Sequence, residues 1–196
     1  MRIVAGRHRG RRLAAPADDS VRPTADRARE GVFNVLAHGR LGANGGSVLA
    51  GALVLDVFAG TGAMGLEALS RGAAQATFME RDPVALDALK RNIASLGEEA
   101  NSHVSRADAT HPPYAPAPAG LAFLDPPYAA GLAAPALLAL AAAGWLAPDA
   151  ILVLEHEGAA PVAPPAGFEV IDARRYGRSR FAFLRFRSAS QSSTKA

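Results

Sequence analysis

The residues with the clearest chemistry form the stretch Asp125-Pro126-Pro127-Tyr128, which follows an apolar run. Asp125 and the backbone carbonyl of Pro126 can each accept one hydrogen of an amino group. The two prolines restrict the loop so that these acceptors converge, and Tyr128 offers an aromatic face on which a base can stack. A carboxylate there also stabilises the positive charge that a nitrogen develops while it accepts a methyl carbon. We therefore predict that these four residues catalyse methyl transfer to an exocyclic amino group.

A glycine-rich loop at residues 56–65 is the second candidate site. Its glycines spell G-x-G-x-x-G at Gly60, Gly62 and Gly65, a pattern that also binds dinucleotides. The pyrophosphate of a dinucleotide is an anion, whereas S-adenosylmethionine carries a sulfonium and an ammonium group. Asp56 lies just before the glycines, and its carboxylate favours the cationic ligand. We predict S-adenosylmethionine as the cofactor; the alternative is that Asp56 only caps its own loop.

Two further carboxylates end the next two predicted strands. Glu80 can accept hydrogen bonds from ribose hydroxyls, and Asp108 can accept one from an adenine amino group. The carboxyl ends of parallel strands line one crevice, so these side chains should meet the glycine loop. The cofactor contacts predicted from this part of the chain are Asp56, Phe58, Gly60, Gly62, Glu80, Arg81, Asp108 and Ala109.

The elements that position these residues alternate between strand and helix patterns. Strands are predicted at 52–57, 76–80, 103–107, 121–124, 150–155, 168–173 and 181–186, and helices at 25–37, 63–70, 84–96 and 132–143. Such alternation predicts an α/β fold with a doubly wound, mostly parallel sheet and helices on both faces. About seven residues separate the last two strands, too few for a crossover helix, so we expect an antiparallel hairpin there. This is the seven-stranded Rossmann-like sheet of class I S-adenosylmethionine-dependent methyltransferases.

Basic residues gather at the two ends of the chain, which carries a formal net charge of +3. One group is Arg2, Arg7, Arg9, Arg11 and Arg12, and the other is Arg174, Arg175, Arg178, Arg180, Arg185 and Arg187. Such clusters suit a phosphate backbone, although a solvated basic face is an equal alternative. We expect residues 1–20 to form a basic N-terminal β-hairpin extension, residues 21–187 the methyltransferase domain, and residues 188–196 a disordered tail.

Several classes of site are not expected. The chain has no cysteine, so disulfides, zinc ribbons and thiol nucleophiles are excluded. The histidines show no metal-ligand spacing, and we predict no metal. No export signal is evident, and the apolar stretch 132–147 is shorter than the roughly 20 residues of a membrane span, so we expect a cytoplasmic protein without a membrane partner. A second Pro-Pro-Tyr sequence, His111–Tyr114, lies in a proline-rich loop with no strand before it, and we predict no catalytic role for it.

The chain resembles the bacterial 16S ribosomal RNA (guanine-N(2))-methyltransferases of the RsmD type. The resemblance reaches about Phe186 and rests on MRIVAGRHRGRRL, RPTADRAREGVFNVL, LDVFAGTGAMGLEALSRGA, FMERD, LDPPY and GWL. It implies S-adenosylmethionine as methyl donor and a guanine of 16S rRNA as substrate, within a small ribosomal subunit or its assembly intermediate. It also implies that Arg22, Pro23 and Thr24 lie over the methionine end of the cofactor, and that the N-terminal arginines Arg7, Arg9, Arg11 and Arg12 bind RNA. His8 stands where the family often has tryptophan.

Three other functions remain compatible with these motifs. The same amino-methyl transfer could act on DNA adenine or on a protein glutamine. A nicotinamide-dependent oxidoreductase would use the same glycine pattern, and a non-catalytic RNA-binding factor would keep the basic ends.

Overall fold

The computed structural model describes residues 1–14, 26–39, 41–42, 46–127, 131–158 and 162–188. Four of the predicted site residues, Arg22, Pro23, Thr24 and Tyr128, lie outside these ranges, as does the predicted tail from residue 189 onward. In the described part of the chain, no helix is both long and apolar enough to cross a membrane.

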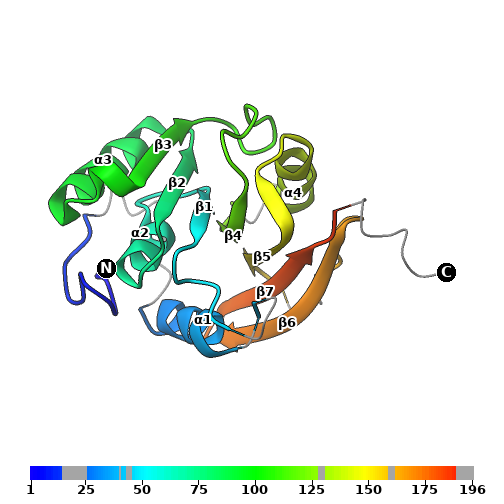
Figure 1. Ribbon diagram of the computed structural model, residues 1–196, viewed down its shortest axis with the longest axis horizontal. Helices are drawn as coiled ribbons and strands as arrows, with labels where there is room; N and C mark the ends of the chain where they lie inside the picture. The colour runs from blue at the N-terminus through cyan, green and yellow to red at the C-terminus, as the bar shows by residue number, and fades with distance from the viewer. Residues whose placement is uncertain (15–25, 40, 43–45, 128–130, 159–161, 189–196) are drawn as a thin grey trace.

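A seven-stranded sheet forms the centre of the protein (Figure 1). The strands are β1 Leu53–Val57, β2 Gln75–Glu80, β3 Ser102–Arg106, β4 Ala119–Leu124, β5 Leu146–His156, β6 Phe168–Tyr176 and β7 Ser179–Phe186. They lie in the order β3-β2-β1-β4-β5-β7-β6, and β7 alone is antiparallel to its two neighbours. The predicted class I methyltransferase fold, with its antiparallel last strand, is therefore confirmed.

The helices cover both faces of the sheet, as the alternating pattern predicts. α1 Asp26–His38, α2 Ala63–Ser70 and α3 Pro83–Leu96 share one apolar core with the sheet, whereas α4 Ala133–Ala142 packs into a second core on the opposite face. A short 3-10 helix, Glu99–Asn101, follows α3. We call the two faces the α1–α3 face and the α4 face.

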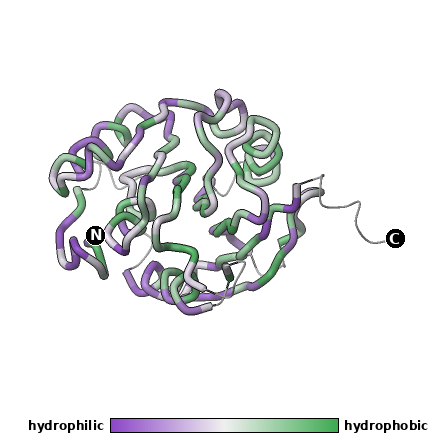
Figure 2. Tube along the Cα trace, viewed as in Figure 1, coloured by the Kyte–Doolittle hydropathy of each residue, from purple (hydrophilic) through white to green (hydrophobic). Residues whose placement is uncertain are grey.

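Local sequence signals explain why these elements start and stop where they do. In α3, the side chain of Asp82 accepts a hydrogen bond from the Val84 amide at 2.8 Å, and Pro83 occupies the first turn. Gly97 ends the helix with a φ of 70°. Figure 2 shows hydrophobic and hydrophilic segments alternating along α3, as expected for a helix with one buried face.

Central strand β1 is buried on both sides, as its continuous apolar run predicts. Val54 joins the core beneath α1–α3, and Leu55 joins the core beneath α4. This burial holds the carboxyl end of β1 in place between β2 and β4.

The last hairpin is longer and tighter than predicted. β6 continues to Tyr176 and β7 begins at Ser179, so that only Gly177 and Arg178 form the turn. Gly177 has a φ of 63°, as two-residue hairpin turns require at their first position. The prediction ended β6 at residue 173 because Arg174 and Arg175 interrupt its apolar pattern, but charged residues are ordinary on an edge strand.

The N-terminal segment also forms a turn back on itself, with less strand structure than predicted. A single antiparallel bridge joins Arg2 to Arg12, and the Ile3 amide donates to the Arg11 carbonyl at 2.9 Å. We call residues 1–14 the N-terminal hairpin. It lies against α2 and α3, at the edge of the molecule that carries the N-terminus in Figure 1.

Candidate active site

Three acidic residues stand at the neighbouring carboxyl ends of β1, β2 and β4. Asp56 is level with Phe78 of β2 and Phe123 of β4. Glu80 and Asp125 each come two residues after those partners, at the carboxyl edge of the sheet. Their charges interact with that of Asp56. The sequence prediction that these three residues stand at the same edge of the sheet agrees with this arrangement, and their role in binding a cofactor stays a prediction.

Asp56 is the most perturbed of the three carboxylates. Its side chain is almost fully buried, and its Oδ2 accepts a hydrogen bond from the Gly65 amide at 2.8 Å. Burial raises the pKa of Asp56 to about 8; the Gly65 hydrogen bond opposes this, and the charges of Asp125 and Glu80 add to it. The capping contact that the sequence left as an alternative is therefore present, and the same carboxyl group also feels the charges of two other acids.

The glycine loop has the backbone conformation expected of a close ligand approach. Phe58, Gly60 and Gly62 all have positive φ, at 56°, 55° and 79°. For Phe58 this is an unfavourable conformation that the surrounding structure must hold. Its side chain is half-buried against the α4-face core.

The glycines at 62 and 65 serve packing as well as conformation. A Cβ at Gly62 would overlap Leu89 of α3, and one at Gly65 would overlap the ring of Phe78. The absence of side chains therefore lets α2 lie directly against β2.

Glu80 holds the glycine loop to the end of β2. Its Oε2 accepts a hydrogen bond from the Gly60 amide at 2.9 Å. Its Oε1 accepts bonds from the amides of Arg81 and Asp82 at 2.8 and 2.9 Å. These bonds orient the carboxylate at the mouth of the loop, where the sequence predicts a ribose contact.

Arg81 and Asp108 pair with one another at the ends of β2 and β3. Arg81 Nη1 lies 2.7 Å from Asp108 Oδ2, and Thr110 donates to Asp108 Oδ1 through both its amide and its hydroxyl. The Thr110 hydrogen bonds, assisted by Arg81, lower the pKa of Asp108 below its ordinary value. Ala109, also predicted as a cofactor contact, is buried in the α4-face core.

The predicted catalytic loop begins directly beside the glycine loop. The Asp125 amide donates to the carbonyl of Val57, the last residue of β1, at 3.4 Å. Pro126 is buried, while Asp125 and Pro127 are exposed. The strand before the motif thus delivers an accessible carboxylate to the same edge as Asp56.

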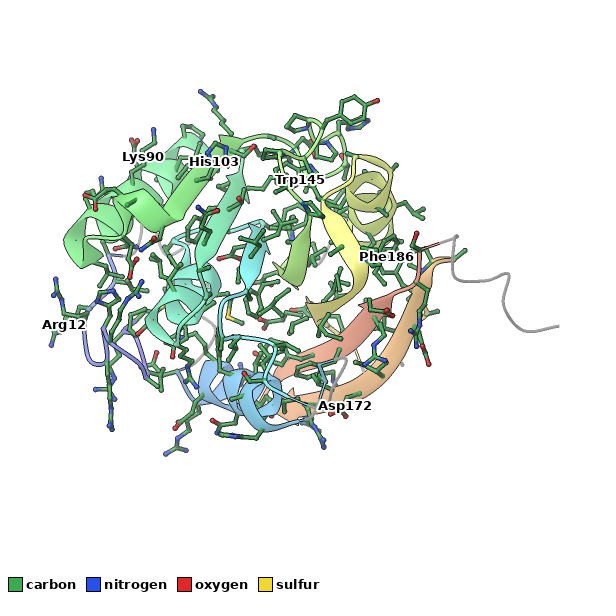
Figure 3. All side chains as sticks on the ribbon, in the orientation of Figure 1. Arg12, Lys90, His103, Trp145, Asp172 and Phe186 are labelled. Atoms are coloured by element: carbon green, nitrogen blue, oxygen red, sulfur yellow. The ribbon has the colours of Figure 1, made fainter. Side chains whose placement is uncertain are left out.

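The second Pro-Pro-Tyr sequence lies elsewhere. Residues 111–114 belong to an irregular connection between β3 and β4, and the Tyr114 side chain is 88% exposed. The Pro113 carbonyl accepts a hydrogen bond from Trp145 Nε1 at 2.7 Å, which ties this loop to the start of β5. Trp145 is labelled beneath the loop in Figure 3.

Two buried glutamates, which sequence reasoning missed, attach the N-terminal hairpin to the domain. Glu67 of α2 is fully buried and accepts hydrogen bonds from the amides of Val4 and Ala5 at 2.7 and 3.0 Å. Arg71 donates to the same carboxylate at 2.7 Å. The spacing of Glu67 and Arg71 resembles an ordinary surface pair on a helix, so the sequence carries no signal of this role.

Glu98, after α3, makes the second attachment. Arg7 contacts both of its carboxylate oxygens at 2.5 to 2.8 Å, and His8 Nε2 lies 2.5 Å from Oε1. Burial of Glu98 opposes its ionisation, but hydrogen bonds from Asn101, Arg7 and His8 outweigh this effect and lower its pKa. Arg7, predicted to contact RNA, and His8 therefore hold the hairpin in place.

The other predicted RNA contacts differ in how they are engaged. Arg11 donates to the Ser95 carbonyl. Within the described ranges, the exposed side chains of Arg9 and Arg12 have no hydrogen bond or ion pair, and Figure 3 shows Arg12 at the outer edge of the molecule. No group of His, Asp or Glu in the described part of the chain could hold a metal ion.

Comparison with known proteins places this site in context. A family model described as "Conserved hypothetical protein 95" matches residues 1–185. The chain is 44% identical over 109 residues to the ribosomal RNA small subunit methyltransferase D of Escherichia coli strain K12. That match covers 56% of this chain and 50% of the relative, so the chain aligns with half the length of this curated protein.

One of the similar solved structures covers nearly the whole chain. The E. coli protein yhhF has a TM-score of 0.79 and 35% identity, over 95% of this chain and 98% of that one. A more distant structure, at a TM-score of 0.51 and 20% identity, covers 65% of this chain and 46% of its own. It is described as a SAM-dependent methyltransferase from Thiobacillus denitrificans in complex with S-adenosyl-L-homocysteine, and at this identity the likeness concerns the fold alone.

Proposed function

The chain belongs to the family described as "Conserved hypothetical protein 95", the RsmD type, and on that premise we propose that it methylates 16S ribosomal RNA. The acceptor is the exocyclic 2-amino group of a guanine, and the donor is S-adenosylmethionine. The observation that carries this proposal is the placement of Asp56, Glu80 and Asp125 at neighbouring strand ends beside the glycine loop. A relative with a ribosomal RNA methyltransferase name supports the choice of substrate.

The charge of the site fits the proposed donor. Bound S-adenosylmethionine would supply an electrophilic methyl group on a sulfonium. Three acidic residues whose charges interact would stabilise a cation and repel the pyrophosphate of a nicotinamide dinucleotide. Asp56 would hold the ammonium end of the donor, Glu80 the ribose, and Asp108 the adenine amino group.

The backbone of the site fits a nucleoside as well. Positive φ at Phe58, Gly60 and Gly62 turns the loop tightly, and Glu80 ties the Gly60 amide to β2. A ligand can therefore approach bare backbone at this point, as it does in other nucleotide-binding glycine loops.

Asp125 and Pro126 would hold the amino group that accepts the methyl. The lone pair of a nucleobase amino nitrogen is delocalised into its ring, so the nitrogen reacts only when it is oriented toward the carbon. Asp125 and the Pro126 carbonyl would each accept one of its hydrogens. As the nitrogen becomes positive, the Asp125 carboxylate would stabilise its charge. Because Asp125 is exposed, the proton that the methylated nitrogen then loses can pass to solvent.

Methyl transfer to defined substrates tests this function. The purified protein is incubated with isotope-labelled S-adenosylmethionine and small ribosomal subunits from a strain that lacks the gene, and nucleosides are analysed by mass spectrometry. We expect label in N2-methylguanosine. DNA and a glutamine-containing protein substrate are tested in parallel, and label on adenine or on protein alone would reject the proposal.

A further inference from the structure

The β6–β7 hairpin and the residue that follows it, Arg187, include six arginines, whose partners divide them into two groups. Arg187 pairs with Asp149 at 2.6 Å and with Glu169 at 3.1 Å. Arg174 pairs with Asp172 at 2.9 Å, and Arg185 donates to the Leu41 carbonyl at 3.2 Å. Arg175, Arg178 and Arg180 form no ion pair within the part of the chain that the structure describes.

Two of the three arginines without an acidic partner stand side by side in the sheet. In the β6–β7 ladder Arg175 is directly opposite Arg180, and in the β5–β7 ladder Arg180 is directly opposite His156. Residues opposite one another in antiparallel strands extend to the same face, and neighbouring strands are about 4.8 Å apart. Arg175, Arg180 and His156 therefore form one line across three strands, which we call the basic row.

The basic row lies on the α4 face. Ala182, the next residue of β7 with the same orientation as Arg180, is buried in the α4-face core, as is its partner Leu154. Arg174 pairs instead with Phe181, which belongs to the α1–α3 core. Two successive arginines of β6 thus lie on opposite faces, and only Arg175 belongs to the row.

The row leads toward the catalytic loop. Leu124 of β4 is level with Leu154 of β5. β5 ends two residues after Leu154, at His156, and Pro126 comes two residues after Leu124, the last residue of β4. Arg178, in the turn between β6 and β7, lies at the same edge of the sheet, where Tyr176 packs beside Gly31 of α1 (Figure 1).

Placing like charges directly opposite one another weakens a sheet. Elsewhere in this region an arginine has an acidic partner: Arg174 pairs with Asp172, and Arg187 pairs with Asp149. We therefore expect repulsion within the row to lower the stability of the free protein, and a polyanion bound across it would offset that repulsion. Phosphate groups match guanidinium donors in charge and geometry, and a histidine ring N–H can donate to the same oxygens.

We propose that the basic row, with Arg178, binds the phosphodiester backbone of the RNA next to the base that enters the catalytic loop. This inference rests on the proposed function for the nature of the substrate. It adds a contact surface on the opposite side of the site from the N-terminal hairpin, for which the bonds of Arg7 to Glu98 indicate a structural role.

The test compares two double variants with the same loss of charge. The row variant carries Arg175→Gln and Arg180→Gln. The control variant carries Arg174→Gln and Arg187→Gln, two arginines that are paired with acids in the structure. Binding to 16S rRNA from a strain lacking the gene is measured over a range of salt concentrations. Loss of two phosphate contacts should reduce the salt slope by about 1.4 and the affinity about tenfold at 0.15 M salt. The control should keep the slope of the unmodified protein.

Stability provides an independent readout. The row variant should unfold at the same temperature as the unmodified protein or at a higher one, because the repulsion between Arg175 and Arg180 is gone. An unchanged salt slope in the row variant, or an equal reduction in both variants, would overturn the proposal. Failure of the unmodified protein to methylate the RNA would reject the proposed function instead, and the two outcomes are read from different assays.

Discussion

The Gly65 amide donates a hydrogen bond to Asp56 Oδ2 across 2.8 Å, which joins the end of β1 to the first turn of α2. The bond links two parts of the glycine loop through a buried carboxyl group whose ionisation is also opposed by the charges of two other acids. Ligand charge, loop geometry and protonation are therefore coupled at Asp56.

The affinity for the methyl donor should rise with pH. Burial, together with the charges of Asp125 and Glu80 and against the Gly65 hydrogen bond, raises the pKa of Asp56 to about 8. Because a cation binds better to the ionised carboxylate, donor affinity should increase from about pH 6 to pH 8, and binding should release a proton within that range. Calorimetry in buffers of different ionisation enthalpy measures both effects. Asp56→Asn should remove the dependence, and affinity that falls with rising pH would contradict the assignment.

The same group should make the free protein less stable at higher pH. Asp56 has a pKa of 3.8 when unfolded and about 8 when folded, so the folded state holds a proton that the unfolded state loses. Its contribution is present below pH 3.8 and is lost as pH rises to about 8. In urea unfolding, the stability of Asp56→Asn relative to the unmodified protein should increase steadily across this window. A constant difference would show that the pKa is not raised.

Gly65→Ala should destabilise the protein by about 1–3 kcal/mol, the usual cost of overpacking. The added methyl would overlap the Phe78 ring and approach Asp56 Oδ2 to 3.2 Å. Gly120→Ala is the matched control, because a Cβ there meets no atom within 4 Å. Thermal unfolding of both variants measures the effect, and equal melting temperatures would mean that the helix can shift without cost.

Asp125→Ala should lower turnover by at least about a hundredfold, which is typical for removal of one group that stabilises developing charge. Donor binding should largely persist, because Asp56, Glu80 and the glycine loop remain in place. Methyl transfer and donor titration are measured on the same preparation. Asp87→Ala, on the exposed side of α3, is the control, and a normal rate in Asp125→Ala would exclude Asp125 as a catalytic residue.

Glu98→Gln should loosen the N-terminal hairpin. Hydrogen bonds from Asn101, Arg7 and His8 lower the pKa of Glu98 despite its burial, so the ionised form stabilises the docked hairpin. This contribution is full above the ordinary pKa of 4.5 and is lost as pH falls through the lower folded value. Limited trypsin digestion at Arg9 and Arg12 should be faster in Glu98→Gln than in the unmodified protein. In the unmodified protein, digestion of the hairpin by an acid-stable protease should become faster at acid pH. Glu99→Gln, on an exposed neighbour, should digest at the normal rate.

The sheet and the common edge at which its acids stand were predictable because they follow from chain order. Alternation of strands and helices places strand ends at one edge, and Asp56, Glu80 and Asp125 each stand at such an end. Helix α2 was predicted at its observed bounds, since glycine before it and polar residues after it mark both ends.

Other parts of the site were not predictable from local patterns. Glu67 and Glu98 look like surface charges in the sequence, and only the folded hairpin shows what they bind. The extension of β6 through Arg174 and Arg175 was missed because strand prediction follows apolar residues, whereas backbone pairing with β7 continues regardless of side-chain polarity. The basic row depends on register between three strands, which no single segment encodes.

The position of β7 has a consequence for synthesis of the protein. β7 follows every other strand in the chain but lies between β5 and β6, so Arg175 and His156 become parts of one surface only when β7 enters the gap. A nascent chain folds from its N-terminus onward as it leaves the ribosome. The glycine loop and its acids can therefore assemble early, whereas the surface that we assign to RNA forms only when β7 has been synthesised. An incomplete chain on the ribosome would then lack this RNA-binding surface.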